Sequence, residues 1–294
     1  MSAPDPWTFS FEPLFLLLAL GASVLYVRDL REAPSGGRPG GLRQVCFFAG
    51  VGLCSIPLNS PLETLSAHYL LIFHLLQNAM VADWGPPLLI LGLSPEQRRR
   101  IGRRGGRPFA RVTEPRVAIA LWLVAWYGVH LPLFYDWALR HGWPLNAEHA
   151  ILISAGLVFW WAPLAVPRRL DALGVAGYLG VAFVASPWLS LAYIWSSQPF
   201  YGFYGAAPRL WGISAVRDQS LAGILMNVEQ TLVFLVALAW ALLRVLDEEE
   251  EAQRLIDAGR YRASPPGQTG DANAVRSSAL PMPTMRGRDP GGRP

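Results

Sequence analysis

Apolar stretches recur along the whole chain, and short polar segments separate them. A stretch of roughly 18 or more apolar residues with few charges is typical of a transmembrane helix. The segments with this pattern lie near 13–30, 43–58, 65–93, 117–136, 147–166, 172–195 and 219–246. The pattern therefore predicts an all-α fold, that of a polytopic membrane protein with a bundle of about seven transmembrane helices.

Charged residues are scarce, since they make up 16% of the chain against 52% for hydrophobic residues. A soluble domain carries about 25% charged residues. The composition thus excludes a soluble core and indicates that the lipid bilayer is the first partner. All 25 basic residues are arginine. No basic stripe is interleaved with aromatic residues as single-strand binding requires, so we expect no nucleic-acid partner.

The arginines are distributed unevenly between the two ends of the predicted helices. On one side lie 22 of them, in the segments after the first, third and fifth helices and in the C-terminal region. The other side holds only Arg140, Arg209 and Arg217. Basic residues in short loops favour the cytoplasm. We therefore expect a multi-pass protein of the inner (plasma) membrane, with its N-terminus outside and its C-terminus in the cytoplasm.

Three regions of different character follow from this topology. Residues 1–246 form the seven-helix transmembrane domain, and 247–262 extend the last helix into the cytoplasm. The segment 263–294 is rich in Pro, Gly, Ser and Arg and poor in apolar residues, which predicts a disordered tail. The arginine run RRRIGRR at 98–104 is predicted to be a solvated loop that faces the lipid headgroups.

All histidines fall toward the predicted outer side of the membrane, and the five positions are His68, His74, His130, His141 and His149. The first two lie in the third helix, the next near the outer end of the fourth, and the last opens the fifth. Ionisable groups in the hydrocarbon region are costly and usually functional. For each histidine taken alone, a hydrogen-bonded interior or interfacial residue is the alternative interpretation.

Two predicted helices carry a polar face near these histidines. In the third helix, His74, Gln77 and Asn78 point the same way because they are spaced i, i+3, i+4, whereas His68 points elsewhere. The last helix has a second stripe at i, i+4, i+7 and i+11, formed by Gln219, Gly223, Met226 and Gln230. Imidazole with thioether, and no thiolate pair, suits copper better than zinc or an iron–sulfur cluster.

Asp83 is a different case, because it lies deeper in the third helix and about 180° around it from His74. It belongs to the sequence DWGPP, where Pro86 and Pro87 lack backbone donors and should kink or break the helix. Asp83 either pairs with the freed backbone groups or water, or lies on a proton or ion path. The sequence leaves both interpretations open.

Three stretches of the chain combine into a recognisable set of motifs. They are HLLQNAMVADWGPPLLILGLSP, VHLPLFYDWAL…EHAILISAGLVFWWAPL and PRLWGISAVRDQSLAGILM. In order and spacing they resemble the H-x-x-Q-H…A-P-P-L-L-x-L-G-x-P, H-x-P-x-x-Y…E-H…F-W-W-P and P-R-x-W-G-(I/L)-S…D-Q-x-x-x-G-x-x-M segments of CtaG-type cytochrome c oxidase assembly factors. The resemblance covers the third to fifth helices, the loop before the last helix, and the start of that helix.

This resemblance implies seven membrane helices and a role in building haem–copper oxidases at a copper centre. The positions that match the motifs are His74, Gln77, His130, Glu148, His149, Asp218, Gln219 and Met226. One position departs, since Asn78 stands where the motif has its second histidine. Asn is a poor ligand for a soft metal. Either the copper role is weakened, or His68 substitutes, or the family's second histidine is not a ligand.

We therefore predict a non-enzymatic membrane assembly factor for a haem–copper cytochrome c oxidase of the respiratory chain. It would bind or deliver copper at an outer-face metal site formed by His74, His130, His149 and Met226. The residues expected to orient these ligands or to contact a partner are Gln77, Asn78, Glu148, Asp218 and Gln219. The partners implied are an oxidase subunit and a soluble copper chaperone on the outer face.

Two other classes of function remain open at this stage. A b-type haem redox protein would use two histidines on facing helices, such as His74 and His130, as axial ligands. A transporter or ion channel would be built around Asp83. The lack of a visible internal repeat counts against a transporter, since many transporters are built from repeated halves. Asp83 is also read as a single deep charge, which counts against a transporter too.

Overall fold

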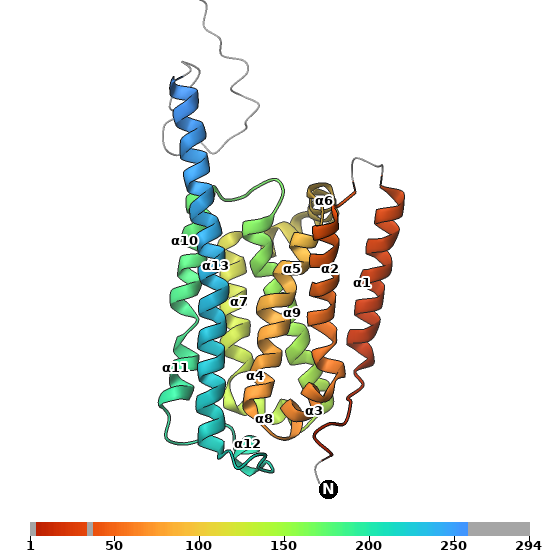
Figure 1. The fold of residues 1–294 in the computed structure, drawn as a ribbon, viewed down its shortest axis with the longest axis vertical. Helices are drawn as coiled ribbons and strands as arrows, with labels where there is room; N and C mark the ends of the chain where they lie inside the picture. The colour runs from red at the N-terminus through yellow and green to blue at the C-terminus, as the bar shows by residue number, and fades with distance from the viewer. Residues whose placement is uncertain (1–3, 34–37, 258–294) are drawn as a thin grey trace, which may run out of the picture. The chain divides into compact units, whose positions relative to one another are not determined.

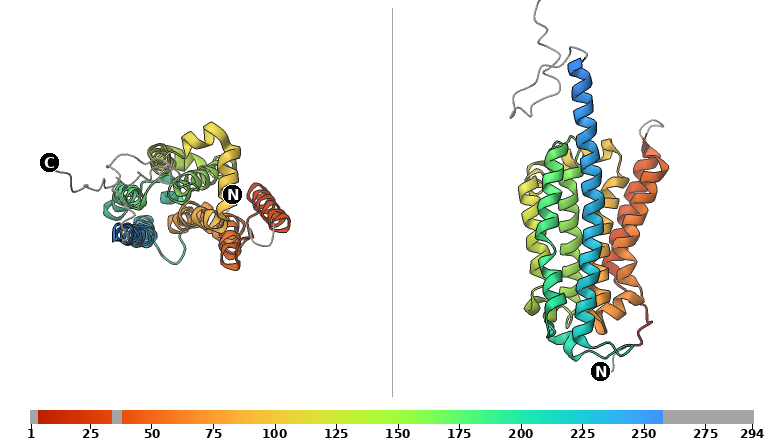
Figure 2. Two further views of the ribbon diagram at one scale, coloured as in Figure 1. Left: turned by 90° about the horizontal axis from the view of Figure 1, so that it is seen from above. Right: turned by 60° about the vertical axis from the view of Figure 1, so that its left-hand side comes forward.

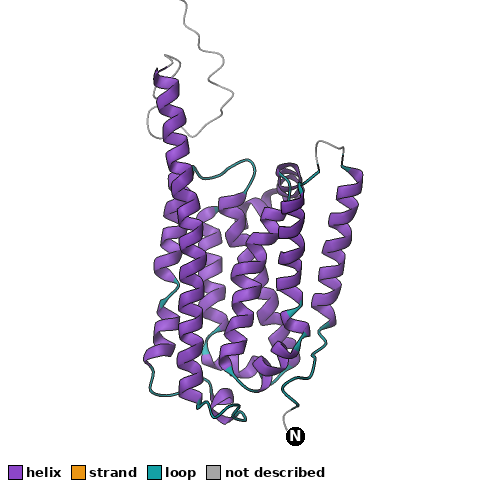
Figure 3. Ribbon diagram, viewed as in Figure 1, coloured by secondary structure: helices purple, strands orange, loops and turns teal. Residues whose placement is uncertain are grey.

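The structure is a computed structural model that describes residues 4–33 and 38–257. Within these ranges the chain forms helices and loops and no strand (Figure 3). The all-helical prediction is thereby confirmed for the described part of the chain. The predicted tail, 263–294, lies outside the described residues, as do the last residues of the predicted cytoplasmic extension.

The elements follow one another in an order that Figure 1 shows along the chain. They are α1 (Pro13–Glu32), α2 (Gly41–Ser55), η1 (Pro57–Asn59), α3 (Pro61–His68), α4 (Leu71–Ala79), η2 (Met80–Trp84), α5 (Gly85–Gly92), α6 (Pro95–Val112), α7 (Pro115–Val129), α8 (Pro132–Ala138), α9 (Gly142–Leu164), α10 (Ala172–Ala185), α11 (Trp188–Trp195), α12 (Gly202–Ala206) and α13 (Ala215–Asp257).

The chain divides into two units, Met1–Glu248 and Glu249–Pro294. In the first unit the longer helices run side by side, and α1 packs at one edge beside α2 (Figures 1 and 2). The short helices α3, α8 and α12 lie at one end of this bundle, and α6 lies at the opposite end (Figure 1). In the second unit, the described residues 249–257 are the last turns of α13, where Arg254 pairs with Glu250.

Four helical stretches are long and apolar enough to cross a membrane: 13–32, 142–164, 172–195 and 215–254. A fifth candidate is the pair α7 and α8, which is bent by 68° at the break between them. The shorter α2 and the segment α4–η2–α5 lie among these helices (Figure 1). The described residues thus contain four or five apolar helical stretches able to span a membrane, while the number seven and the orientation stay predictions.

The predicted third helix, 65–93, is divided in the structure into α3, α4, η2 and α5. The prolines explain the irregular turn η2, a π-helix, because Pro86 and Pro87 cannot donate to the carbonyls four residues earlier. The amide of Gly85 donates instead to the Met80 carbonyl, five residues back, which is the π-helical pattern. The predicted break at DWGPP is therefore a widened turn, and the chain continues as a helix beyond it.

The arginine run predicted as a solvated loop is helical, since it belongs to α6. A capping box explains why the helix begins there: the Ser94 hydroxyl accepts from the Gln97 amide, and the Gln97 side chain accepts from the Ser94 amide. One arginine of the run also points inward. Arg98 is buried and donates to the Leu164 carbonyl at 2.7 Å, so it ties α6 to the end of α9.

A close helix contact positions α9 against the π-turn. A Cβ atom on Gly156 would overlap the Ala82 carbonyl oxygen and would lie 2.8 Å from Cγ of Pro86. Only glycine permits this approach. In a bilayer, where apolar association is not driven by water, such close backbone packing is a main source of helix association. The contact fixes the depth at which α9 presents its polar residues to α4.

Candidate functional site

His74, in α4, is fully buried at the end of the bundle where α3, α8 and α12 lie. Its Nδ1 atom is 2.9 Å from the Tyr204 hydroxyl oxygen. That hydroxyl donates its single proton to the Ser66 carbonyl at 2.6 Å. The imidazole must therefore donate from Nδ1 to the hydroxyl oxygen. The remaining nitrogen, Nε2, then carries a free lone pair, as a metal ligand requires.

Glu148, in α9, faces this nitrogen. Its Oε1 atom lies 3.2 Å from Nε2 of His74, and both side chains are fully buried. Oε1 also accepts a hydrogen bond from the Asn78 amide at 3.1 Å. Nε2 and the second carboxylate oxygen, Oε2, have no hydrogen-bond partner in the described part of the chain. Two lone-pair-bearing atoms at this separation are stabilised when a proton or a cation lies between them.

His149 follows Glu148 on α9 and completes the most closely packed part of the site. Its ring centroid is 5.8 Å from that of His74, and it is 1% exposed. Phe15 of α1 packs edge-on against the ring at 6.1 Å. Among the described residues, Nε2 of His149 has no hydrogen-bond partner either. Two buried imidazole nitrogens and a carboxylate thus belong to one neighbourhood.

His130, at the end of α7, borders this group without joining it. Its Nδ1 atom lies 2.6 Å from the Trp126 carbonyl oxygen, so Nδ1 is the donor and Nε2 carries the lone pair. The Tyr135 ring contacts both histidines, with centroids 5.6 Å from His130 and 4.8 Å from His74. His130 is therefore linked to the other two through an aromatic ring. We call His74, His130, Glu148 and His149 the histidine cluster.

Met226, the predicted thioether ligand, comes from α13. It is 1% exposed and belongs to the buried apolar core that also contains Tyr135 and Leu75. The predicted stripe on this helix lies on its inner face, since Gln219, Gly223 and Gln230 are buried as well. His68 and His141 are exposed, so they stand apart from the buried cluster.

The histidine cluster is not a preformed metal cage. Within residues 4–33 and 38–257, no group of three or more His, Cys, Asp or Glu side chains is close enough to hold a metal ion. The structure brings His74, Glu148 and His149 together and holds His130 beyond the Tyr135 ring. The donor chemistry still fits copper, because three buried imidazoles each present an unpaired Nε2 atom.

The other predicted residues stabilise the surrounding helices and loops. The Asp218 carboxylate accepts from the amides of Leu71 and Ile72 at 2.8 and 3.1 Å, so it caps α4. The Gln219 side chain accepts from the Phe200 amide at 2.7 Å and holds the loop before α12. Gln77 turns away from the histidines and donates to Glu63 and to the Pro57 carbonyl. These contacts support the site from outside it.

Sequence reasoning missed the tyrosines that surround the histidines. Tyr135, Tyr193, Tyr201 and Tyr204 are all buried. The Tyr201 hydroxyl donates to the His130 carbonyl at 2.9 Å, and the Tyr193 and Tyr201 hydroxyls contact each other. The available signal was the run of tyrosines in YGFYG at 201–205, which reads as interfacial when the loop is taken alone.

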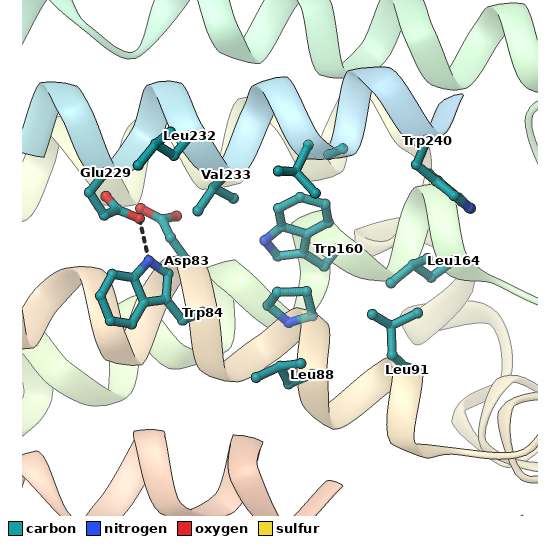
Figure 4. Close-up of a pocket in the computed structure, with 13 residues that line it drawn as sticks. Asp83, Trp84, Leu88, Leu91, Trp160, Leu164, Glu229, Leu232, Val233 and Trp240 are labelled. Atoms are coloured by element: carbon teal, nitrogen blue, oxygen red, sulfur yellow. Dashed lines mark hydrogen bonds between the residues drawn. The ribbon is translucent and has the colours of Figure 1, made fainter. Parts of the chain in front are cut away.

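Glu229 was missed as well, and it corrects the interpretation of Asp83 as a single deep charge. Glu229 lies in the apolar part of α13 and is 7% exposed. Both carboxylates line the same cavity, away from the histidines (Figure 4). An acidic residue inside an apolar helix indicates a functional position by itself.

The sequence model of one family, Caa3_CtaG, described as cytochrome c oxidase caa3 assembly factor, matches residues 23–248. The matched range contains the histidine cluster, Met226, and the pair Asp83 and Glu229. Comparison with curated proteins found no match, and comparison with solved structures found none.

Proposed function

The chain belongs to the family of caa3 cytochrome c oxidase assembly factors, and from this premise we propose that it binds copper and delivers it to the oxidase. Family membership indicates a non-catalytic role in oxidase assembly, and the apolar helices indicate a membrane protein. Copper is then the cargo of this protein, and an oxidase subunit is its recipient. A soluble copper chaperone on the outer face would supply the ion.

The observation that carries the proposal is the state of the imidazole nitrogens. His74 and His130 are held by Nδ1–H donors to fixed oxygens, which leaves Nε2 of each as a lone-pair donor. A hydrogen bond from the second ring nitrogen is how proteins orient metal-binding histidines. Copper accepts imidazole and thioether ligands, so His149 and Met226 supply further donors of the right class.

The contacts of Asn78 bear on the departure from the family motif. Its amide donates to Glu148 Oε1, the same oxygen that faces His74. Asn78 is therefore suited to orient the carboxylate. Among the three explanations for the departure, this geometry favours a motif position that acts through hydrogen bonding. We propose that Asn78 supports the site and that copper is held by the histidines.

The competing interpretations receive less support from the same region. A haem ligated by His74 and His130 would have to replace the Tyr135 ring, which contacts both imidazoles. The transport interpretation rests on Asp83, whose cavity is lined almost entirely by apolar side chains. A path for ions needs polar groups along its length. Copper delivery is therefore the function that this geometry supports best.

Orientation is the first point to test. The helix α6, with its arginines, lies at the end of the bundle opposite to α3, α8 and α12 (Figure 1). Since basic residues favour the cytoplasm, a reporter fused after Arg107 should be cytoplasmic, and one inserted near His141 should be outside. Paired phosphatase and fluorescent-protein fusions measure both positions. A cytoplasmic signal at His141 would contradict an outer-face site.

Deletion of the gene tests the function itself. Cells without the protein should make oxidase polypeptides and haem but lose cytochrome c oxidase activity and the copper of the oxidase. Added external copper should restore part of the activity, because mass action replaces a carrier that raises local supply. Activity, haem spectra and metal content of the purified oxidase give the three readouts. Complementation with His141→Ala is the matched control and should restore activity fully.

Two outcomes would contradict the proposal. Normal activity and full copper content in the deletion strain would show that the protein is not needed for copper insertion. Loss of haem from the oxidase, with copper retained, would show that the protein acts in haem insertion and not in copper insertion.

A further inference from the structure

A second candidate site lies in a cavity of about 510 Å³ between the η2–α5 segment, α9 and α13 (Figure 4). Cavities of this size accept small organic ligands. Its walls are apolar except at one end, where two carboxylates meet. No histidine lines the cavity within the described residues. The site is therefore separate from the histidine cluster, and its occupant is independent of the proposed copper function.

The mouth of the cavity faces the surroundings of the helices. Leu232 and Val236 of α13 are 59% and 71% exposed, and Leu91 of α5 is 40% exposed. Leu232 and Val236 lie on a helix of membrane-spanning character, where exposed apolar side chains face lipid tails. A ligand would therefore enter sideways from the bilayer. This route selects molecules that already dissolve in the hydrocarbon region.

Asp83 and Glu229 lie beside each other at one end of the cavity (Figure 4). They are 3% and 7% exposed. Oε1 of Glu229 accepts a hydrogen bond from the Trp84 indole at 2.7 Å. Oε2 of Glu229 and Oδ2 of Asp83 have no hydrogen-bond partner among the described residues. Buried acceptors of this kind are normally satisfied by a donor. The Gln230 side chain lies next to Asp83, and its amide nitrogen also has no hydrogen-bond partner among the described residues, so a ligand hydroxyl would compete with this amide for Asp83.

The π-turn explains why an acidic side chain reaches this cavity. Widened turns rotate the following side chains relative to a regular helix, and they are frequent at functional sites. Asp83 lies in η2, three residues before Pro86. Glu229 lies on α13, the helix across the cavity from η2. Two acceptors from different helices thus converge on one end of an apolar space.

The chemistry of the walls decides between a cationic and a neutral ligand. A cation would pair with the carboxylates, but it would first have to leave water and cross hydrocarbon, which costs several kcal/mol. A neutral hydroxyl group is far easier to desolvate and supplies a donor for the unpaired oxygen of Glu229. The indoles of Trp84 and Trp160 line the cavity and offer flat faces to an aromatic ring.

We propose that this cavity binds a membrane-soluble aromatic alcohol with an apolar chain, the chemical class of the quinols. A ring hydroxyl would donate its single proton to the free oxygen of Glu229 or of Asp83. The ring would pack against the indoles, and the chain would leave through the mouth between α5 and α13. The occupant comes from the bilayer, and neither copper nor the histidine cluster takes part in binding it.

The first experiment compares two probes on the full-length protein in detergent. Radiolabelled decyl-benzoquinol should bind, and the dimethyl ether of the same molecule should bind roughly tenfold more weakly. The ether has the same ring and chain but no hydroxyl donor, so its weakness measures the hydrogen bonds to the carboxylates. Equal affinity for the two probes would overturn the proposal. Dodecylammonium, as a cationic competitor, should not displace the quinol, and efficient displacement would overturn it too.

The second experiment locates the site with matched variants. Val233→Trp places an indole in the cavity and should weaken quinol binding by at least about tenfold. Val228→Trp introduces the same side chain at a 52% exposed position of the same helix, outside the cavity, and should leave binding unchanged. Glu229→Met removes one of the two acceptors at similar volume and should reduce the preference for the quinol over its ether.

Unchanged binding in Val233→Trp, or equal losses in both tryptophan variants, would contradict this location. The probe comparison is made on the unaltered protein, so it decides the proposal even if a variant fails to fold.

Discussion

His74→Ala is expected to weaken Cu(I) binding by roughly 100-fold or more in the detergent-purified protein. Changes to groups that merely orient a metal ligand cost about 10–100-fold in affinity, and His74 is itself the proposed ligand. Its Nε2 lone pair is fixed by the hydrogen bond from Nδ1 to Tyr204 and faces Glu148. Competition with a chromogenic Cu(I) chelator measures the affinity. His149→Ala should have a comparable effect, because its ring is the nearest second imidazole.

His68→Ala and His141→Ala are the matched controls, since each removes the same group from an exposed position. Both should retain the affinity of the unaltered protein. His130→Ala should also lower the affinity if copper recruits its Nε2 atom past the Tyr135 ring. Full copper affinity in His74→Ala, His149→Ala and His130→Ala together would show that the proposed site is wrong.

Gly156→Val is expected to destabilise the fold by roughly 3 kcal/mol or more. Even a Cβ atom at this position would overlap the Ala82 carbonyl, and inserting extra methylenes into a packed core costs about 1–3 kcal/mol. A branched side chain adds further atoms at the same contact. Neither the π-turn nor the proline pair can easily move aside, because both are backbone features. Thermal or denaturant unfolding in detergent measures the loss.

Gly177→Val is the matched control for that change. Gly177 lies in α10, where a Cβ atom would meet no atom within 4 Å. Valine at position 177 has the same intrinsic cost in a helix as valine at position 156, but it causes no steric overlap. If the two variants were equally stable, close packing of α9 on the π-turn would not contribute to stability.

The membrane class of the fold could be predicted because apolar stretches of sufficient length are a direct consequence of hydrocarbon thickness. The breaks within the stretches could not be placed in the same way. The segment 65–93 reads as one apolar run, yet the chain turns at Tyr69 and Leu70 and restarts at α4 under the Asp218 cap. That cap comes from a residue nearly 150 positions away, which no local pattern contains. Long-range capping overrides local hydrophobicity here.

The histidine cluster shows the same division between local and distant information. The i, i+3, i+4 spacing on α4 predicted a shared face for His74, Gln77 and Asn78, and all three side chains are buried, because a helix period is a local property. The hydroxyl oxygen that accepts the hydrogen bond from Nδ1 and so sets the His74 tautomer belongs to Tyr204, which is 130 residues further along the chain. The loop that carries this tyrosine folds back onto the cluster, and its course depends on the packing of Tyr201 and Gln219. The tautomer of His74 and the position of the Tyr204 ring could therefore be found only from the structure.

The arginine run 98–104 was predicted to be a loop for a different reason, although it is part of α6. Arginine is a good helix former, and Ser94 with Gln97 is a capping signature, so the helical signal was present in the chain. A high density of positive charge was given greater weight than either signal. The inward hydrogen bond from Arg98 to Leu164 shows that one charge of the run has a structural role.

The widened turn at η2 can be viewed as an evolutionary event. A π-turn holds one residue more than an α-turn, so the insertion of a single residue converts one into the other without breaking the helix. Relatives that lack the insertion would be one residue shorter between their counterparts of His74 and Pro86. Their acidic residue would point about 100° away from α13, and it could not meet a counterpart of Glu229. An alignment of the family at this one position would therefore separate the members with a carboxylate pair from those without it.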